Sequence, residues 1–213
     1  MAEEPEEHVD EQLGDEVEPE RPALDPETAA RRAGALAQVR QFGDPVLKAK
    51  AVPVERFDDQ LRAEVARMAG IMGDAIGVGL AATQLGVMHR VLVYKVGEDG
   101  LLAAVVNPEL EWAGDDIEEA EEGCLSLPGI AVDVERPLHA RVRGVDLRGE
   151  PMLLEASGLE ARVLQHEVDH LDGVLIVDRT TREQRKGALG ALREGTGYAP
   201  PHLDEDGAGD EDG

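Results

Sequence analysis

The stretch LEARVLQHEVDHLDG, residues 159–173, contains two histidines four residues apart. On a helix, His166 and His170 lie on one face and can bind a single metal ion, while Glu167 beside them is a candidate general base toward water. A catalytic metal site needs three protein ligands and one open position. The pair therefore predicts part of a site, and a pair of hydrogen-bonded core histidines is the structural alternative.

The third ligand has to come from another part of the chain. Downstream of the pair, Glu183, Glu194 and His202 do not have the spacing typical of zinc peptidases. Upstream, Cys124 is the only cysteine and lies in the stretch EEGCLSLPG, residues 121–129, which we predict as a loop or strand edge. One cysteine and two histidines leave one coordination position open, as in catalytic sites. The alternative is that Cys124 is only a small buried hydrophobic residue.

Composition limits the other possibilities. The chain has 213 residues, a formal net charge of -25 and only 2% aromatic residues. Much of the negative charge lies at the ends, with 12 acidic residues in 1–33 and 6 in 204–213. Such segments bury little apolar surface. We therefore predict disordered acidic tails at 1–33 and 196–213 around a single catalytic metallohydrolase domain at 34–195.

Charge and cysteine content also bear on partners and location. An acidic body with few aromatic residues is a poor surface for phosphates and stacked bases, so we expect no sequence-specific nucleic acid as a partner. The single cysteine allows no intrachain disulfide bond. No signal peptide and no membrane-spanning run is recognised, and we therefore predict a cytoplasmic protein without a membrane partner.

Several elements can be predicted from periodicity and turn signals. Residues 39–58 are rich in turn signals and predict extended strand and loop. Apolar residues at helical spacing predict a helix over 58–75, with Asp58 as its N-cap. Two hairpins are predicted, one from strands at 91–96 and 102–107 and one over 138–156.

The helix with the histidines is expected to begin at a capping box formed by Ser157 and Glu160. After it, we predict a strand at 174–179 and a short helix at 180–194. The order of elements does not alternate strand and helix as parallel sheets do. We therefore predict an α+β fold in which mainly antiparallel β-sheets pack around a central helix carrying the HExxH motif, with a further C-terminal helix.

Three motifs together resemble those of peptide deformylases. They are GVGLAATQ at 77–84, EGCLS at 122–126 and HEVDH at 166–170, in this order. The segment FGDPVL at 42–47 is similar to the N-terminal region of that family, and the resemblance covers roughly residues 37–190. Chance matches multiply, so three motifs in order are a specific signal.

The resemblance implies an enzyme that hydrolyses the N-formyl group from the N-terminal formylmethionine of nascent polypeptides and releases formate. It implies one divalent metal ion. Fe²⁺ is the ion expected in the cell, and Zn²⁺, Ni²⁺ or Co²⁺ are the other options. The implied ligands are Cys124, His166 and His170. Soft thiolate ligation fits iron or zinc better than magnesium or calcium.

The resemblance also implies further roles. Glu167 would be the general base and then the acid toward the leaving amine. Gln84 and the backbone N–H of Leu125 would donate hydrogen bonds to the oxyanion. Gly79 would present its backbone to the substrate peptide, and Val78 with Leu125 would line an apolar pocket for the methionine side chain, unless both are ordinary core residues.

Partners and alternatives follow from the same reasoning. The substrates would be N-formylmethionyl nascent peptides, and the basic residues within 179–193 suggest a contact with the ribosome, or simply a solvated helix face. Asp169 would pair with Arg136. One alternative function is an HExxH metallopeptidase, in which Cys124 would have no essential role. Another is a non-catalytic metal-binding protein, although Glu167 and Gln84 would then be unnecessary.

Overall fold

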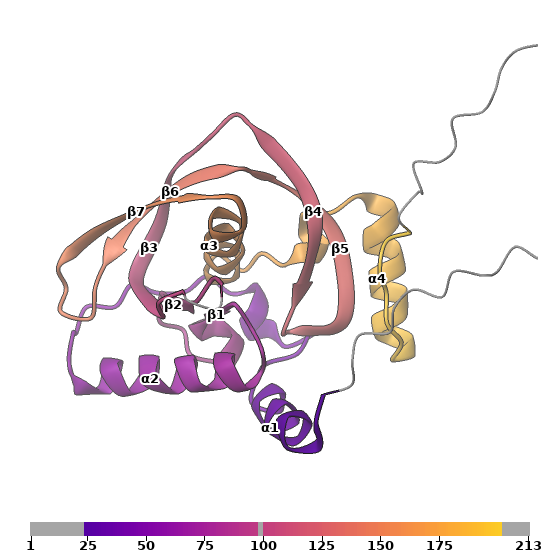
Figure 1. Ribbon diagram of the computed structural model, residues 1–213, viewed down its shortest axis with the longest axis horizontal. Coiled ribbons are helices and arrows are strands. Elements are labelled where there is room, and N and C mark those ends of the chain that lie inside the picture. The colour runs from indigo at the N-terminus through magenta and orange to yellow at the C-terminus, as the bar shows by residue number, and fades with distance from the viewer. Residues whose placement is uncertain (1–23, 98–99, 202–213) are drawn as a thin grey trace, which may run out of the picture.

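The computed structural model describes residues 24–97 and 100–201. Its centre is the helix α3 (Gly158–Leu171), which two antiparallel sheets enclose (Figure 1). The predicted α+β class, with a central helix carrying the HExxH motif and a further C-terminal helix, is confirmed. No helix within the described ranges is long and apolar enough to cross a membrane.

The larger sheet has five strands in the order β1-β2-β3-β6-β7. Their bounds are Gly79–Ala81 (β1), Val91–Tyr94 (β2), Ala103–Ala113 (β3), His139–Val145 (β6) and Pro151–Ser157 (β7). The predicted hairpins β2–β3 and β6–β7 are both confirmed as antiparallel pairs. Side chains alternate across β2, so Val91 and Val93 pack toward α2, while Leu92 packs toward α3.

The second sheet is a long hairpin of β4 (Ile117–Cys124) and β5 (Leu127–Pro137). We predicted only a loop or strand edge around Cys124, and the extent of this hairpin was missed. Most side chains of β4 are exposed. Its sequence therefore does not alternate regularly between apolar and polar residues. The register shifts between Gly123 and Cys124 as the chain turns toward β5. This turn brings the cysteine to the inner side, beside α3.

The start of α3 differs from the predicted capping box. The Ser157 side chain makes no cap hydrogen bond, and its hydroxyl contacts Nδ1 of His139 at 2.8 Å. Glu160 instead accepts a hydrogen bond from the Tyr94 hydroxyl at 3.0 Å. The Ser157 contact therefore joins β7 to β6, and the Glu160 contact attaches α3 to β2, so neither side chain closes the first turn of α3.

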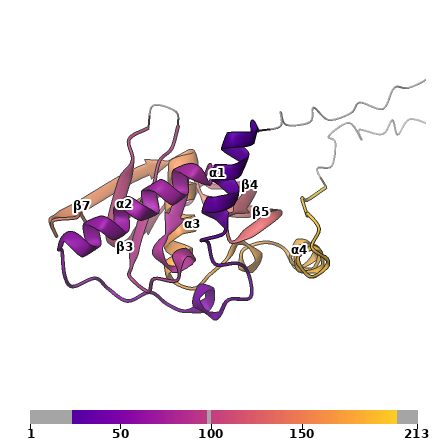
Figure 2. The same ribbon diagram turned by 90° about the horizontal axis from the view of Figure 1, so that it is seen from below.

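The helix α2 (Asp59–Asp74) covers the other face of the larger sheet (Figure 2). It matches the helix predicted over 58–75, and the carboxylate of Asp58 accepts hydrogen bonds from the backbone N–H groups of Gln60 and Leu61. The predicted apolar stripe of this helix is buried. Residues 39–58 are mainly loop, as expected, but contain the short 3-10 helix η1 (Pro45–Lys48).

A helix precedes these elements where we predicted a disordered tail. The helix α1 (Pro26–Leu36) begins inside the segment 1–33, with the Asp25 carboxylate as N-cap and proline at the first position. The remainder of that predicted tail, residues 1–23, lies outside the described residues. Helix α1 packs beside α2 and closes one end of the apolar core.

The chain after α3 also departs from the prediction. Residues 174–179 were predicted as a strand, but they form a loop and the 3-10 helix η3 (Ile176–Asp178), in which the Asp178 carboxylate accepts from the N–H of Leu175. Helix α4 (Arg182–Glu194) confirms the C-terminal helix and packs against β5. Residues 195–201, which we predicted to belong mostly to a disordered tail, are described and return to β5, while 202–213 are not described.

Candidate active site

Three potential metal ligands converge where α3 meets the end of β4. The Nε2 atoms of His166 and His170 are 3.2 Å apart, and the Sγ atom of Cys124 is 3.2 Å from Nε2 of His170. The ligand atoms of all three residues lie within 4.8 Å of one another. The predicted set is therefore brought together by two elements far apart in the sequence.

The chemistry of this donor set fits a divalent transition metal. One thiolate and two imidazoles suit iron or zinc, and three protein donors leave room for a reactant. The two imidazole rings meet edge to face, with an interplanar angle of 72°, and direct both Nε2 atoms toward the same point. Two nitrogen lone pairs that face each other repel, so this arrangement is unfavourable unless a proton or a cation lies between the Nε2 atoms.

Glu122 orients one of these ligands and was missed in the sequence. Its Oε2 atom lies 3.0 Å from Nδ1 of His166. A carboxylate can only accept, so Nδ1 carries the proton and Nε2 is left free to bind a cation. Burial opposes the charge of Glu122, but hydrogen bonds from Arg136 and His166 lower its pKa to about 2. The carboxylate is therefore ionised at neutral pH.

A buried ionic cluster surrounds Glu122. Arg136 donates to Glu122 at 2.5 and 2.9 Å and to Asp169 at 2.9 Å, which confirms the predicted Arg136–Asp169 pair. Arg162 of α3 donates to Glu122 at 2.9 Å and to the backbone oxygen of Val134 at 2.8 Å. The cluster joins the β4–β5 hairpin to α3, so the elements that carry the three potential ligands are fixed relative to each other.

Glu167 lies next to the ligands without being one of them. Its side chain is buried, and its Oε2 atom has no hydrogen-bond partner among the described residues. Burial raises the pKa of Glu167 to about 7. A carboxylate with a pKa near neutrality can both take and return a proton at physiological pH.

The side-chain amide N–H groups of Gln84 point toward the potential metal ligands. It lies in the short 3-10 helix η2 (Ala82–Leu85), and its Oε1 atom accepts from the backbone N–H of Ala81 at 2.9 Å. Its Nε2 atom then lies 3.2 Å from the hydroxyl of Ser126 and 3.8 Å from Sγ of Cys124. The donor atom is thus fixed beside the potential ligands.

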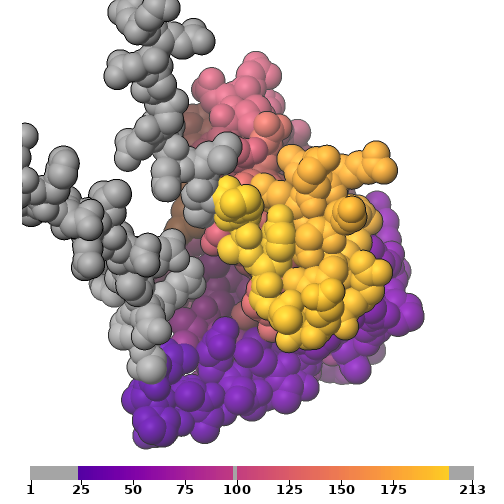
Figure 3. All heavy atoms as spheres, turned by 90° about the vertical axis from the view of Figure 1, so that its right-hand side faces the viewer, coloured from indigo at the N-terminus to yellow at the C-terminus, as the bar shows by residue number. Residues whose placement is uncertain are grey.

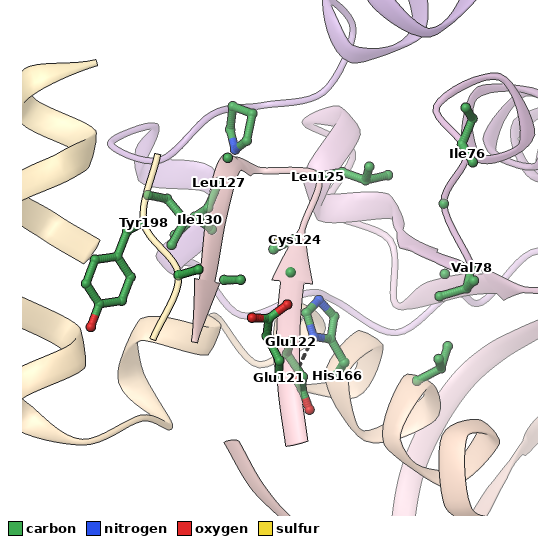
Figure 4. Close-up of a pocket in the computed structure, with 18 of the residues that line it drawn as sticks. Ile76, Val78, Glu121, Glu122, Cys124, Leu125, Leu127, Ile130, His166 and Tyr198 are labelled. Carbon is green, nitrogen blue, oxygen red and sulfur yellow. Dashed lines mark hydrogen bonds and ion pairs between the residues drawn. The ribbon is translucent and has the colours of Figure 1, made fainter. Parts of the chain in front are cut away.

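The remaining predicted residues line one cavity with these groups. Gly79, Val78 and Leu125 lie along its wall, and Figure 4 shows Val78 and Leu125 on the side opposite Tyr198. Val78 is exposed and Leu125 is half-buried, so Val78 is not an ordinary core residue. A Cβ atom on Gly79 would lie 2.4 Å from Oε1 of Glu167, so this position has a constraint that we did not foresee.

Sequence reasoning missed two further parts of the cavity. Arg32 and Leu36 of α1 lie on its wall, and so do residues 197–201 after α4. Arg32 and residues 197–201 belong to the segments that we predicted as acidic tails, while Leu36 lies just inside the predicted domain. Asp25 as N-cap and the proline after it were the local signals for α1.

Comparisons with known proteins agree with this geometry. Residues 36–186 match the model of the polypeptide deformylase family. A peptide deformylase of Acidothermus cellulolyticus is 49% identical over 160 residues, which are 75% of this chain and 87% of the relative.

Solved structures with the same fold include a peptide deformylase from Synechococcus elongatus in complex with actinonin, with 40% identity, a TM-score of 0.70 and coverage of 75% of this chain and 88% of that one. The structure of peptide deformylase from Thermotoga maritima is 47% identical, with a TM-score of 0.65 and coverage of 67% of this chain and 96% of that one. The chain therefore belongs to the polypeptide deformylase family and is a metal-dependent amide hydrolase.

Proposed function

We propose that this protein removes the formyl group from N-terminal formylmethionine of nascent polypeptides, with its reacting centre at Cys124, His166, His170 and Glu167. The observation that carries the proposal is the buried, unpartnered Oε2 atom of Glu167 beside a convergent Cys-His-His group. Family membership supports deformylation over the metallopeptidase and binding-protein alternatives.

Cys124, His166 and His170 would hold the metal ion. A divalent cation bound there supplies Lewis acidity, which polarises the formyl carbonyl and makes water a better nucleophile at neutral pH. Glu122 contributes by keeping the proton of His166 on Nδ1. We propose Fe²⁺ as the ion in the cell, with Zn²⁺, Ni²⁺ and Co²⁺ as possible replacements, because thiolate and imidazole donors suit all of them.

Glu167 moves the proton in this proposal. It takes a proton from the attacking water as the water oxygen bonds to the formyl carbon. It then gives that proton to the nitrogen of methionine as the C–N bond breaks, which yields formate and a free amine. A pKa of about 7 allows both steps without a large penalty.

Gln84 and the backbone N–H of Leu125 stabilise the negative oxygen that develops on the formyl group. The bond from Ala81 fixes the Gln84 amide before substrate binds, so little reorganisation is needed. Removal of one such donor typically costs about 2.7–4 kcal/mol in the barrier. On the substrate side, Gly79 offers backbone at the edge strand β1, and Val78 offers apolar surface for the methionine side chain.

Formate release from a formyl-Met peptide, measured with the metal content of the same anaerobic sample, tests the proposal. We expect Glu167→Gln to keep one equivalent of metal and to lose activity by at least about 100-fold. The Cys124→Ala variant should lose metal and activity together, which separates deformylase chemistry from that of a peptidase with an unneeded cysteine. Metal bound by the wild type with no formate from any formyl peptide would refute the assignment.

The ion itself needs a separate measurement. We expect protein purified anaerobically to contain iron and to lose activity in air, since ferrous iron with a thiolate ligand is sensitive to oxygen. Reconstitution of the metal-free protein with Ni²⁺ or Zn²⁺ serves as the control. If the anaerobic sample contains zinc alone and air has no effect, iron is not the native ion.

We further propose that the protein works in the cytoplasm and contacts the ribosome through α4, since its substrates emerge there. The exposed cations of this helix include Arg182, Lys186 and Arg193. Two others of the predicted patch form ion pairs, Arg179 with Asp169 and Arg185 with Asp178, so they are less available to a partner.

Ribosome co-sedimentation at low salt tests this contact. Charge reversal at Arg182, Lys186 and Arg193 should abolish it, because surface attraction to phosphate depends on net charge. Reversal of Arg141 and Arg143 in the larger sheet is the matched control and should leave binding intact. Unchanged co-sedimentation of the α4 variant would exclude this surface.

A further inference from the structure

The cavity is larger than its smallest substrate requires. Its volume is about 1740 Å³, and it runs from Cys124 and His166 across the β4–β5 hairpin to the segment that follows α4. Small-molecule sites typically measure about 300–1,000 Å³. A formylmethionine residue therefore fills only the end beside α3. The remaining volume lies over Pro128, Gly129 and Ile130.

A short segment after α4 forms the far wall of this cavity. We call residues 195–201 the C-terminal strap. The N–H of Tyr198 donates to the oxygen of Gly129 at 2.8 Å, and the N–H of Ala131 donates to the oxygen of Tyr198 at 2.8 Å. The strap thus extends the β4–β5 sheet by one parallel bridge. Figure 3 views this side of the molecule, where α4 and the strap are coloured orange to yellow.

The position of the strap depends on a glycine of α4. The aromatic ring of Tyr198 packs directly on Gly187, where a Cβ atom would lie 2.3 Å from its Cε2 atom. Gly195 ends the helix in the left-handed conformation and lets the chain turn back toward β5. The strap is therefore fixed both to α4 and to the hairpin.

We infer that the C-terminal strap is a specificity-determining part of the active site and binds the residues that follow formylmethionine in the substrate. The inference rests on the proposed function. Figure 4 shows Tyr198 and Ile130 on one side of Cys124, and Ile76 and Val78 on the other. An extended peptide whose first residue lies at Cys124 and Val78 can continue over Ile130 toward Ala199. The wall there is mainly apolar, so apolar third and fourth residues fit best.

Two formyl peptides separate this inference from the proposed function. Formyl-Met-Ala reaches only the reacting centre, whereas formyl-Met-Ala-Leu-Leu-Ala extends to the strap. If the wild type hydrolyses neither, the proposed function fails. If it hydrolyses both with the same kcat/KM, the strap contributes nothing and the further inference fails. We expect the longer peptide to have a kcat/KM about tenfold higher, through a lower KM.

Gly187→Ala displaces the strap without changing its sequence. We expect this variant to raise KM for the longer peptide about tenfold and to leave kcat and the short peptide unchanged. Gly190→Ala on the same helix is the matched control, because no heavy atom lies within 4 Å of its added Cβ. Equal effects on both peptides, or none on the longer one, would overturn the inference.

A second variant avoids any effect on packing. Ala199 is exposed and lines the cavity, so Ala199→Asp places a negative charge on the strap without filling the core. We expect this variant to hydrolyse formyl-Met-Ala-Leu-Leu-Ala less well and formyl-Met-Ala-Lys-Lys-Ala better than the wild type does. An unchanged preference between these two peptides would exclude contact with the strap.

Discussion

Substitution of Gly79 by alanine should inactivate the enzyme through Glu167. An added Cβ atom would lie 2.4, 2.8 and 2.9 Å from Oε1, Cδ and Cγ of Glu167. Gly79 does not adopt a positive φ, so its backbone accepts alanine without strain. Optimal carbon contacts are about 3.5–4.0 Å, so the carboxylate has to move by roughly 1 Å. The side chain is buried, and the space open to it is the cavity that it lines, so any shift takes the carboxylate away from its place beside the ligands.

The magnitude follows from this displacement. A misplacement of about 1 Å at a reacting group costs on the order of 100-fold in rate, which corresponds to about 2.7 kcal/mol in the barrier. Overpacking typically costs about 1–3 kcal/mol of stability, and a folded, metal-loaded variant is therefore expected. We expect a lower kcat for formate release from formyl-Met-Ala, with one equivalent of metal retained. The loss should be the same for the longer peptide.

Two control experiments test whether displacement of Glu167 causes the loss of activity. Gly73→Ala in α2 adds a Cβ atom with no heavy atom within 4 Å, and it should have wild-type activity. In the Gly79→Ala background, Glu167→Asp removes the methylene group that the new Cβ meets, so the two losses should be less than additive. Full kcat in Gly79→Ala, or strictly additive losses, would refute the assignment of Glu167 as the displaced group.

Three further substitutions test the supporting structure. Glu122→Ala leaves Arg136 and Arg162 without their shared carboxylate, and it should cost about 3–5 kcal/mol in urea denaturation and about 10–100-fold in metal affinity by competition with a chelator. Gly173→Ala forces a Cβ atom to 2.7 Å from the backbone oxygen of Lys48 at a φ of 75°, so the melting temperature should fall while kcat is kept. Although partial burial opposes its charge, the hydrogen bond from Arg90 keeps the pKa of Asp172 below 3.8. Asp172→Asn should therefore lower the free energy of unfolding near neutral pH. The difference in this free energy from the wild type should vanish as the pH falls through the lowered pKa of Asp172. Denaturation at several pH values measures it.

Local patterns predicted much of the fold. The stripe of α2 with its Asp58 cap, both hairpins of the larger sheet and the helix α4 depend on short-range periodicity and turn chemistry, and all were correct. The strand predicted over 174–179 was wrong, because a short apolar run can be buried in any conformation. Helix α1 was missed because acidic composition outweighed the signal of Asp25 and Pro26.

The candidate site was predictable where it consists of motifs. Cys124, His166 and His170 were named from residue type and spacing, and they converge in the structure. Glu122 and Arg162 were not found, because a buried ion pair between residues distant in sequence leaves no local pattern. The contribution of residues 197–201 to the cavity depends on the return of the chain after α4, which no periodicity in this segment indicates.

The distance along the chain between the ligands couples metal supply to protein turnover. Cys124 and His170 are 46 residues apart, so an unfolded chain has to close a long loop to offer all donors at once. The ion therefore binds the native state in preference, and its loss lowers the free energy of unfolding by mass action. In a cell short of this metal, a larger share of these molecules would be exposed to proteases. The amount of the enzyme would then follow metal availability without any dedicated sensor.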